Sequence, residues 1–202
     1  KLMNKLEDYA IKNVAKGGFY IFLGMAISTI TFSLYKILAA RYLGPSDYGL
    51  LTLGIIILNI ATILGLAGIH HSIGRFVNHY FAEKDNSKIK GLLVSSFLIT
   101  ISLSIIIAAL IYLFSSNISI KIFGTPDLKM ILFVFSIAVP FSTATQLLKY
   151  YFYAFKQPQF AIISESLFEK TVNLVFLILA IMLSANVYAI SWGYAASLII
   201  SS

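Results

Sequence analysis

The sequence contains no cysteine and few charged residues, and both absences limit what the protein can be. Without cysteine, the chain cannot form a disulfide framework or a thiolate metal site. Charged residues make up only 11% of the chain. A soluble domain carries about 25%, so too little polar surface is present to cover a water-soluble globule. The sequence also lacks a phosphate-binding loop, a dinucleotide fingerprint and a hydrolase elbow. We therefore expect no catalytic site, no metal site and no cofactor.

Apolar sequence is what the chain has in abundance, since 59% of its residues are hydrophobic and its mean hydropathy is +0.89. A hydrocarbon core about 30 Å thick is crossed by about 20 helical residues. The sequence predicts an all-α integral membrane protein, a single domain over residues 1–202 with about six transmembrane helices. The expected spans are residues 17–40, 50–69, 91–114, 130–148, 160–183 and 187–202. Gly44 and Pro45 separate the first two spans, and a charged loop from Asn78 to Lys90 precedes the third.

The last two spans depend on a break inside a long uncharged run. Residues 171–202 would form a helix of about 48 Å, too long for one ordinary crossing. We expect a break at Ser184-Ala185-Asn186, which forces the fifth helix to recruit residues from the 160s. The alternative is one strongly tilted helix. Because the chain stops within an apolar run, we expect a fragment of a longer transporter rather than a chain that functions alone.

Lysine and arginine give the chain a net charge of +7, and they gather at the ends of the apolar runs. This placement is typical of topology signals and contacts with membrane lipids, not of nucleic-acid binding. One side of the membrane receives eleven of these residues: Lys1, Lys5, Lys12, Lys16, Arg75, Lys84, Lys88, Lys90, Lys149, Lys156 and Lys170. The other side receives Lys36, Arg41, Lys121 and Lys129. The positive-inside rule then predicts a multi-pass protein of the cytoplasmic membrane with both ends of this segment in the cytoplasm. The mixed polar start is typical of an amphipathic lead-in helix rather than a cleavable signal peptide.

Glu165, Glu169 and Asn173 are spaced four residues apart and so share one face of a helix. Ionisable groups at membrane depth are costly and usually face a cavity or a partner. This face is a candidate site for a coupling ion, H+ or Na+. The alternative is that Glu165 lies at the interface and Glu169 pairs locally with Lys170 or with a basic residue of another helix.

Four cations near the ends of spans are candidate ligands for an anionic substrate head: Lys36, Arg41, Arg75 and Lys149. Arginine can bind a diphosphate through two parallel hydrogen bonds, and Arg75 follows a helix rich in small residues. The alternative for each is an anchor that reaches lipid headgroups. Asn59 adds a polar group to the second span and suggests a hydrophilic groove, although the small residues around it are typical of close helix packing.

The loop and helix from Ala39 to Lys90 also resemble a known family. The stretch Ala40–Gly49, the stretch Leu64–Ile69 and the run Gly74-Arg75-Phe76 are similar to those of polysaccharide biosynthesis (Wzx-like) flippases. These proteins belong to the multidrug/oligosaccharidyl-lipid/polysaccharide (MATE/MOP) exporter superfamily. The resemblance implies twelve to fourteen helices in two lobes, of which this chain would be the N-terminal lobe. It also implies cationic cavity residues that hold a diphosphate-sugar head, and of the four candidates only Arg75 matches a family-like position.

We therefore expect a transporter that flips a polyprenyl-diphosphate-linked oligosaccharide by alternating access. One alternative is a cation-coupled multidrug antiporter of the same superfamily, with Glu165 and Glu169 as its ion site. The other is a membrane-embedded glycan polymerase or ligase, which would need longer outer loops than the short ones predicted here.

Overall fold

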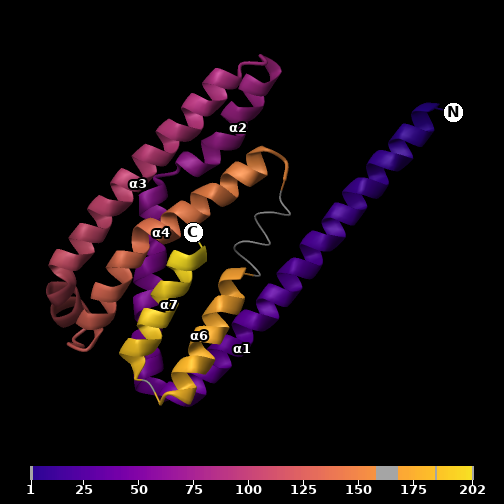
Figure 1. Ribbon diagram of the computed structural model, residues 1–202. Helices are drawn as coiled ribbons and strands as arrows, with labels where there is room; N and C mark the ends of the chain where they lie inside the picture. Colours follow the sequence, from indigo (N-terminus) through magenta and orange to yellow (C-terminus); the bar gives the residue numbers. More distant parts are fainter. Residues whose placement is uncertain (1, 158–167, 185, 202) are drawn as a thin grey trace.

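The computed structural model describes residues 2–157, 168–184 and 186–201, with side chains described from residue 22 onward. All the elements in these ranges are helical, so the predicted all-α membrane fold is confirmed (Figure 1). The elements are α1 (Leu2–Leu66), α2 (Ile69–Ala82), α3 (Asn86–Asn117), the short π-helix η1 (Ile118–Ile122), α4 (Leu128–Ala154), α6 (Lys170–Met182) and α7 (Val187–Ser201).

Helix α1 is two helical arms joined at Gly44. Gly44 has φ 74° and ψ 175°, a conformation open to glycine because it lacks a Cβ. Pro45 then begins the second arm, where its missing N–H has no helical partner to lose. The arms, residues 22–43 and 45–66, are each about 33 Å long at 1.5 Å per residue, enough to cross a hydrocarbon core. The interruption predicted at Gly44 and Pro45 is therefore confirmed. Gly44 is the residue at which the backbone departs from helical geometry.

The predicted charged loop from Asn78 to Lys90 is wrong, because this stretch is mostly helical. Helix α2 continues to Ala82, and only residues 83–85 separate it from α3. Ile73 and Val77, one turn apart, are buried, so α2 is an amphipathic helix with its polar residues outside. Asp85 caps α3 by accepting a hydrogen bond of 3.0 Å from the Lys88 backbone N–H.

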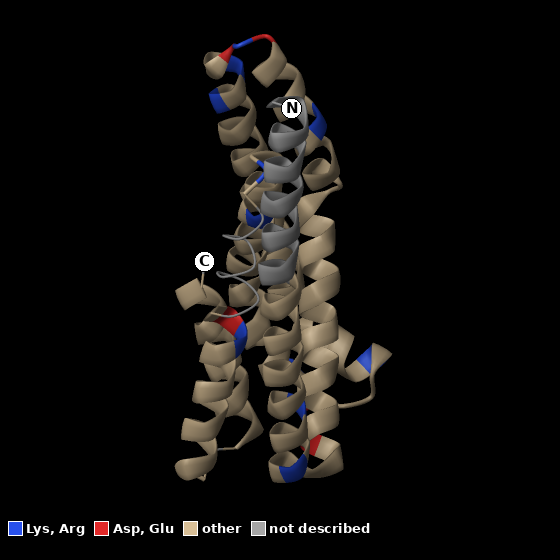
Figure 2. Ribbon diagram, turned by 90° about the vertical axis from the view of Figure 1, so that its right-hand side faces the viewer, with Lys and Arg blue, Asp and Glu red and all other residues tan. Residues whose placement is uncertain are grey.

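Most of the described helix connections lie at the two ends of the bundle (Figure 1). At the end that we name the Lys-rich end lie the 83–85 turn and the last turn of α4, with Lys84, Lys88, Lys90 and Lys156. The opposite end holds Gly44, the 123–127 link and the turn between α6 and α7. In Figure 2 the charged segments lie mostly toward these ends, leaving long uncharged lengths between them.

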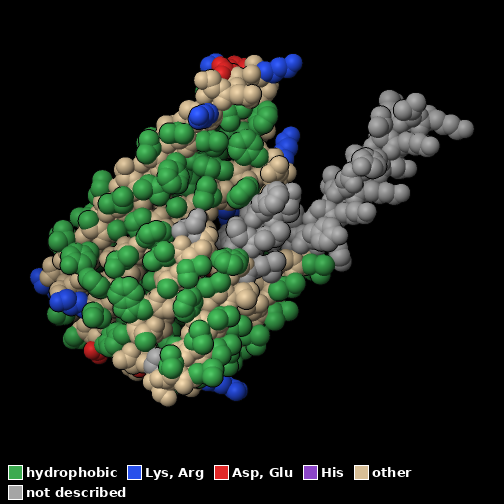
Figure 3. All heavy atoms as spheres, in the orientation of Figure 1, with side chains coloured by type: hydrophobic (Ala, Val, Ile, Leu, Met, Phe, Trp, Pro, Cys, Tyr) green, Lys and Arg blue, Asp and Glu red, His purple; other side chains and the backbone are tan. Residues whose placement is uncertain are grey.

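Helix α4 is the centre of the packing, with contacts to α1, α2, α3 and α7. Its side chains Leu132, Phe135 and Val139 are almost completely buried. Helix α3, in contrast, exposes a row of large apolar side chains that includes Phe97 and Leu113. Figure 3 shows how far apolar side chains cover this face of the molecule. A surface of this kind is stable against lipid and not against water.

Three of the described helical stretches are long and apolar enough to cross a membrane: residues 22–82, 86–122 and 128–154. The first contains both arms of α1. Helices α6 and α7 are shorter apolar helices on either side of residues 183–186, so the single tilted helix over residues 171–202 is excluded. The residues expected to lengthen α6, including Glu165, lie outside the described part of the chain.

Candidate functional site

A polar cavity of about 140 Å³ lies where four helices meet within the bundle. Liquid water takes about 30 Å³ per molecule, so the cavity has room for a few waters or one small ion with its ligands. Its lining consists of Leu58 and Asn59 of α1, Ser142, Thr145 and Gln146 of α4, Glu169 and Lys170 at the start of α6, and Tyr194 and Leu198 of α7. We name this space the central cavity.

The central cavity contains an ion pair. The Lys170 ammonium donates to Oε1 of Glu169 at 2.9 Å, and the two side chains are 22% and 8% exposed. Helix α6 begins at Lys170 and runs for 13 residues, or about 20 Å, to the opposite end of the bundle. The pair therefore lies at membrane depth, where an isolated charge is expensive.

A second ammonium lies beside the pair. Nζ of Lys36 is 4.6 Å from the centroid of the Phe32 ring, and Nζ of Lys170 is 4.8 Å from the same centroid. The negative face of an aromatic ring attracts cations at such distances. Among the described residues Lys36 has no carboxylate partner, so this part of the site holds two positive charges and one negative charge. The excess positive charge favours an anion.

Hydrogen-bonding groups next to the pair are not all satisfied. Oδ1 of Asn173 accepts a hydrogen bond from Oγ of Ser197. Nδ2 of Asn173 and the hydroxyl of Tyr35 are buried without a partner among the described residues. Because a buried amide N–H is costly to leave unpaired, this region has hydrogen bonds to offer to water or to a ligand.

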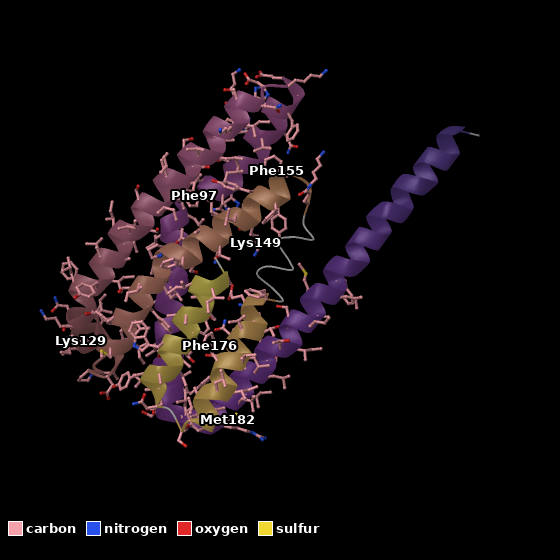
Figure 4. The ribbon with its side chains drawn as sticks, in the orientation of Figure 1. Phe97, Lys129, Lys149, Phe155, Phe176 and Met182 are labelled. Atoms are coloured by element: carbon pink, nitrogen blue, oxygen red, sulfur yellow. The ribbon has the colours of Figure 1, made fainter. Side chains whose placement is uncertain are left out.

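One face of α4 links the central cavity to the Lys-rich end. Ser142, Thr145 and Gln146 line the cavity, and Lys149 and Tyr153 follow on the same face at helical spacing. Lys149 is half-buried, and Figure 4 shows it on the side of α4 that faces α6 and α7. This polar face runs through a span in which apolar side chains would be cheaper, which is typical of a helix that faces water or a polar ligand.

The structure brings some of the predicted residues together and separates others. Asn59 and Glu169 line the central cavity, and Asn173 lies one turn along α6. Lys36 lies beside them through Phe32. Arg41, near Gly44, and Arg75, on α2, are exposed residues outside the cavity lining. Glu165 lies outside the described residues. The local pairing of Glu169 with Lys170 is confirmed, and the pair faces the cavity.

The sequence interpretation missed the α4 lining and underestimated Lys170. Ser142, Thr145 and Gln146 are polar residues three and four positions apart within an apolar span, a pattern that could have marked a lined face. Lys170 was considered only as a topology signal and as a partner for Glu169. Tyr194 gave no signal, because tyrosine in a membrane helix is common.

Residues 14–202 of the chain match the family described as polysaccharide biosynthesis protein. No curated protein matches the chain, and no solved structure does. The match covers nearly the whole sequence and agrees with the membrane fold and with the motifs around Gly44. The chain therefore belongs to the polysaccharide biosynthesis protein family.

Proposed function

We propose that the protein is a flippase that moves a polyprenyl-diphosphate-linked oligosaccharide across the cytoplasmic membrane by alternating access. One observation carries the proposal: the ammonium groups of Lys36 and Lys170 lie against one aromatic ring, and of the two only Lys170 is paired with a carboxylate, beside a polar cavity at membrane depth. A diphosphate carries the charge that this arrangement lacks. No bond of the substrate is broken, so the protein acts as a transporter and not as an enzyme.

The Lys-rich end faces the cytoplasm in this proposal. Lys84, Lys88, Lys90 and Lys156 lie there, and positive residues are retained on the cytoplasmic side of membranes. The glycan head would enter from this end along the polar face of α4 while the lipid tail stays in the bilayer. Lys149, on that face, would meet the diphosphate on its way to Lys36 and Lys170. Arg75, exposed on α2 at this end, would attract the head from the cytoplasm, and Arg41 would meet it near the opposite end.

Glu169 provides a means of coupling substrate movement to the binding of an ion. Its carboxylate is bound to Lys170. A diphosphate that draws Lys170 away leaves the carboxylate without a partner in a poorly hydrated place, where it gains by binding H+ or Na+. Asn173 and Asn59 add amide oxygens within the same region, as Na+ prefers, and Glu165 would extend the ion site.

A cation-coupled multidrug antiporter is the second candidate. The observation that favours it is the burial of Glu169 at a cavity with an aromatic wall from Tyr194, since a carboxylate and a ring together bind organic cations. The excess of positive charge at Lys36 and Lys170 disfavours a cationic substrate.

The test uses the protein reconstituted in vesicles with a fluorescent short-chain polyprenyl diphosphate that carries N,N′-diacetylchitobiose. A membrane-impermeant reductant bleaches the dye only in the outer leaflet, so protein-dependent loss of the protected half measures movement between leaflets. We expect movement by the wild-type protein and at least a 10-fold slower rate for Lys36→Gln. Lys121→Gln, at the opposite end of the bundle, is the matched control and should move the probe at the wild-type rate. A wild-type rate equal to that of empty vesicles, together with efflux of a cationic dye, would favour the antiporter.

A further inference from the structure

Two hollows between α2 and the last turns of α4 form a continuous cleft at the Lys-rich end. The first is about 260 Å³ and is lined by His70, His71, Gly74, Asn78, Tyr150, Tyr153 and Ala154. The second is about 460 Å³ and is lined by Asn78, Phe81, Ala82, Ala154, Phe155 and Lys156. Asn78 and Ala154 belong to both, so the hollows adjoin. We name this space the inner cleft. It shares no lining residue with the central cavity.

Aromatic rings form the walls of the inner cleft. The His70 ring lies 3.9 Å from that of His71 and 4.5 Å from that of Tyr150, measured between centroids. Tyr150 also meets Tyr153 edge to face at 6.1 Å. At the far end Phe81 and Phe155 pack edge to face at 6.0 Å, and Figure 4 shows Phe155 at the end of α4. The cleft thus has aromatic side chains along its length.

Polar groups in the cleft have unused hydrogen-bonding capacity. Nδ1 of His70 is buried and has no partner among the described residues. Nδ2 of Asn78, a lining residue of both hollows, donates to the Gly74 carbonyl at 2.6 Å, and its side-chain oxygen remains an acceptor. Ligand pockets commonly combine apolar and aromatic walls with a few placed polar groups of this kind.

The charge around the cleft is positive. Lys156 lines it, Arg75 lies next to Gly74 on α2, and Lys149 precedes Tyr153 by one helical turn. Two carboxylates of the turn that follows α2, Glu83 and Asp85, are bound to Lys88 at 3.2 and 3.3 Å. A ligand with attached negative charge is therefore attracted to this end.

The geometry points to the inner cleft as a saccharide-binding site, which holds the sugar residues of the glycan head before they reach the central cavity. The apolar faces of a sugar carry weakly positive C–H groups that stack on aromatic rings, and its hydroxyls need acceptors and donors such as the Asn78 amide and the His70 ring. A lipid tail would leave the buried Nδ1 of His70 unpaired, which is costly. The role of this site in transport rests on the proposed function. The binding experiment that tests the site does not depend on transport.

The test measures sugar binding without transport. Saturation-transfer NMR is recorded on the purified protein in lipid nanodiscs with glucose, N-acetylglucosamine, glucuronic acid and rhamnose as probes. We expect signal from at least one sugar. That signal should fall at least 5-fold in Tyr150→Leu and in Asn78→Leu, and it should be retained in Tyr150→Phe, which keeps the ring. Tyr112→Leu, in a separate aromatic hollow at the opposite end, is the matched control and should leave the signal unchanged.

The outcomes separate this inference from the proposed function. Lys36→Gln should bind the sugar normally even though it moves the lipid-linked probe at least 10-fold more slowly. Sugar binding that requires Tyr150 and Asn78 in a protein that moves no lipid would refute the flippase and retain the saccharide site. No signal from any sugar, equal signals in Tyr150→Leu and wild type, or displacement of the sugar by soluble short-chain phosphatidylglycerol would each overturn the site, the last by assigning the cleft to a lipid headgroup.

Discussion

Gly54 of α1 lies so close to Phe135 of α4 that a Cβ on the glycine would lie 2.7 Å from Cε2 of the ring. It would also lie 2.5 Å from Cγ2 of Ile131, one turn earlier. Phe135 and Ile131 are completely buried, so neither can move aside cheaply. The contact sets the distance between the second arm of α1 and α4, two of the helices that line the central cavity.

Gly54→Ala should therefore destabilise the protein by about 1–3 kcal/mol, the usual cost of overpacking a full core. The measurement is the free energy of unfolding, or the midpoint of thermal unfolding, in one detergent. Gly49→Ala is the matched control, because a Cβ at Gly49 meets no atom within 4 Å. Equal midpoints for the two variants would show that the Gly54 contact does not limit the distance between α1 and α4.

The Glu169–Lys170 pair predicts a stability pattern that single substitutions alone cannot give. Glu169→Gln leaves the Lys170 ammonium without its carboxylate, and Lys170→Gln leaves an unpaired carboxylate that is only 8% exposed. Each should lower the unfolding midpoint, since breaking one side of a buried pair commonly costs about 3–5 kcal/mol, and the partial exposure of Lys170 lowers that figure. The double variant should be more stable than either single variant, because both charges are gone. Additive losses in the double variant would show that the two groups do not interact.

The Phe32 ring makes cation–π contacts with both ammonium groups of the proposed diphosphate site. We expect transport to depend on its aromatic ring and not only on its volume. Phe32→Leu keeps an apolar side chain but removes the ring, which is worth about 0.5–2 kcal/mol for a cation–π contact. We expect the rate of probe movement between leaflets to fall about 3- to 10-fold, and Phe32→Tyr to retain most of it. Phe97→Leu, on the exposed face of α3, is the control. A rate unchanged in Phe32→Leu would remove the ring from the site.

The sequence predicted the membrane fold well because its strongest signal, long uncharged runs, depends only on bilayer thickness. Gly44 and Pro45 could also be recognised from the sequence, since glycine permits a positive φ and proline lacks the N–H that would continue a helix. The prediction of a loop from Asn78 to Lys90 is wrong because it rests on charge alone, whereas α2 continues to Ala82 and α3 begins at Asn86, with Ile89 buried. Local polarity does not distinguish a loop from an amphipathic helix that packs on one face.

The candidate site was only partly predictable, because its residues come from four helices. Glu169 and Asn59 could be found one at a time as polar residues inside apolar spans. Glu169 and Asn59 line one cavity with Gln146 and Tyr194 only because α1, α4, α6 and α7 pack together. No single segment of the sequence specifies that packing. The pairing of Lys36 with Lys170 across Phe32 depends on the same packing, as does the exposure of Arg75 away from the cavity.

The Asp85 cap gives the α2–α3 turn a pH dependence whose direction follows from its hydrogen bonds. The backbone N–H of Lys88 donates to the carboxylate, and this bond is the main cause that lowers the pKa of Asp85; the Lys88 side chain adds to it. A carboxyl whose pKa is lower in the folded protein than in the unfolded chain stabilises the fold above its ordinary pKa, and this contribution is lost as the pH falls through the lowered value. We therefore expect the turn to loosen below about pH 4, the ordinary pKa of aspartate.

Amide exchange at Lys88 measures this effect, expressed as a protection factor so that the intrinsic effect of pH on exchange is removed. Protection should be high at pH 6 and several-fold lower at pH 3 in the wild-type protein. Asn caps helices about as well as Asp but does not titrate, so Asp85→Asn should keep the same protection at both pH values, and Asp85→Ala should be poorly protected at both. A wild-type protein with equal protection at pH 3 and pH 6 would show that the neutral carboxyl still caps α3. The Lys-rich end would then keep its shape in acid through the helix packing of Ile73 and Val77 alone.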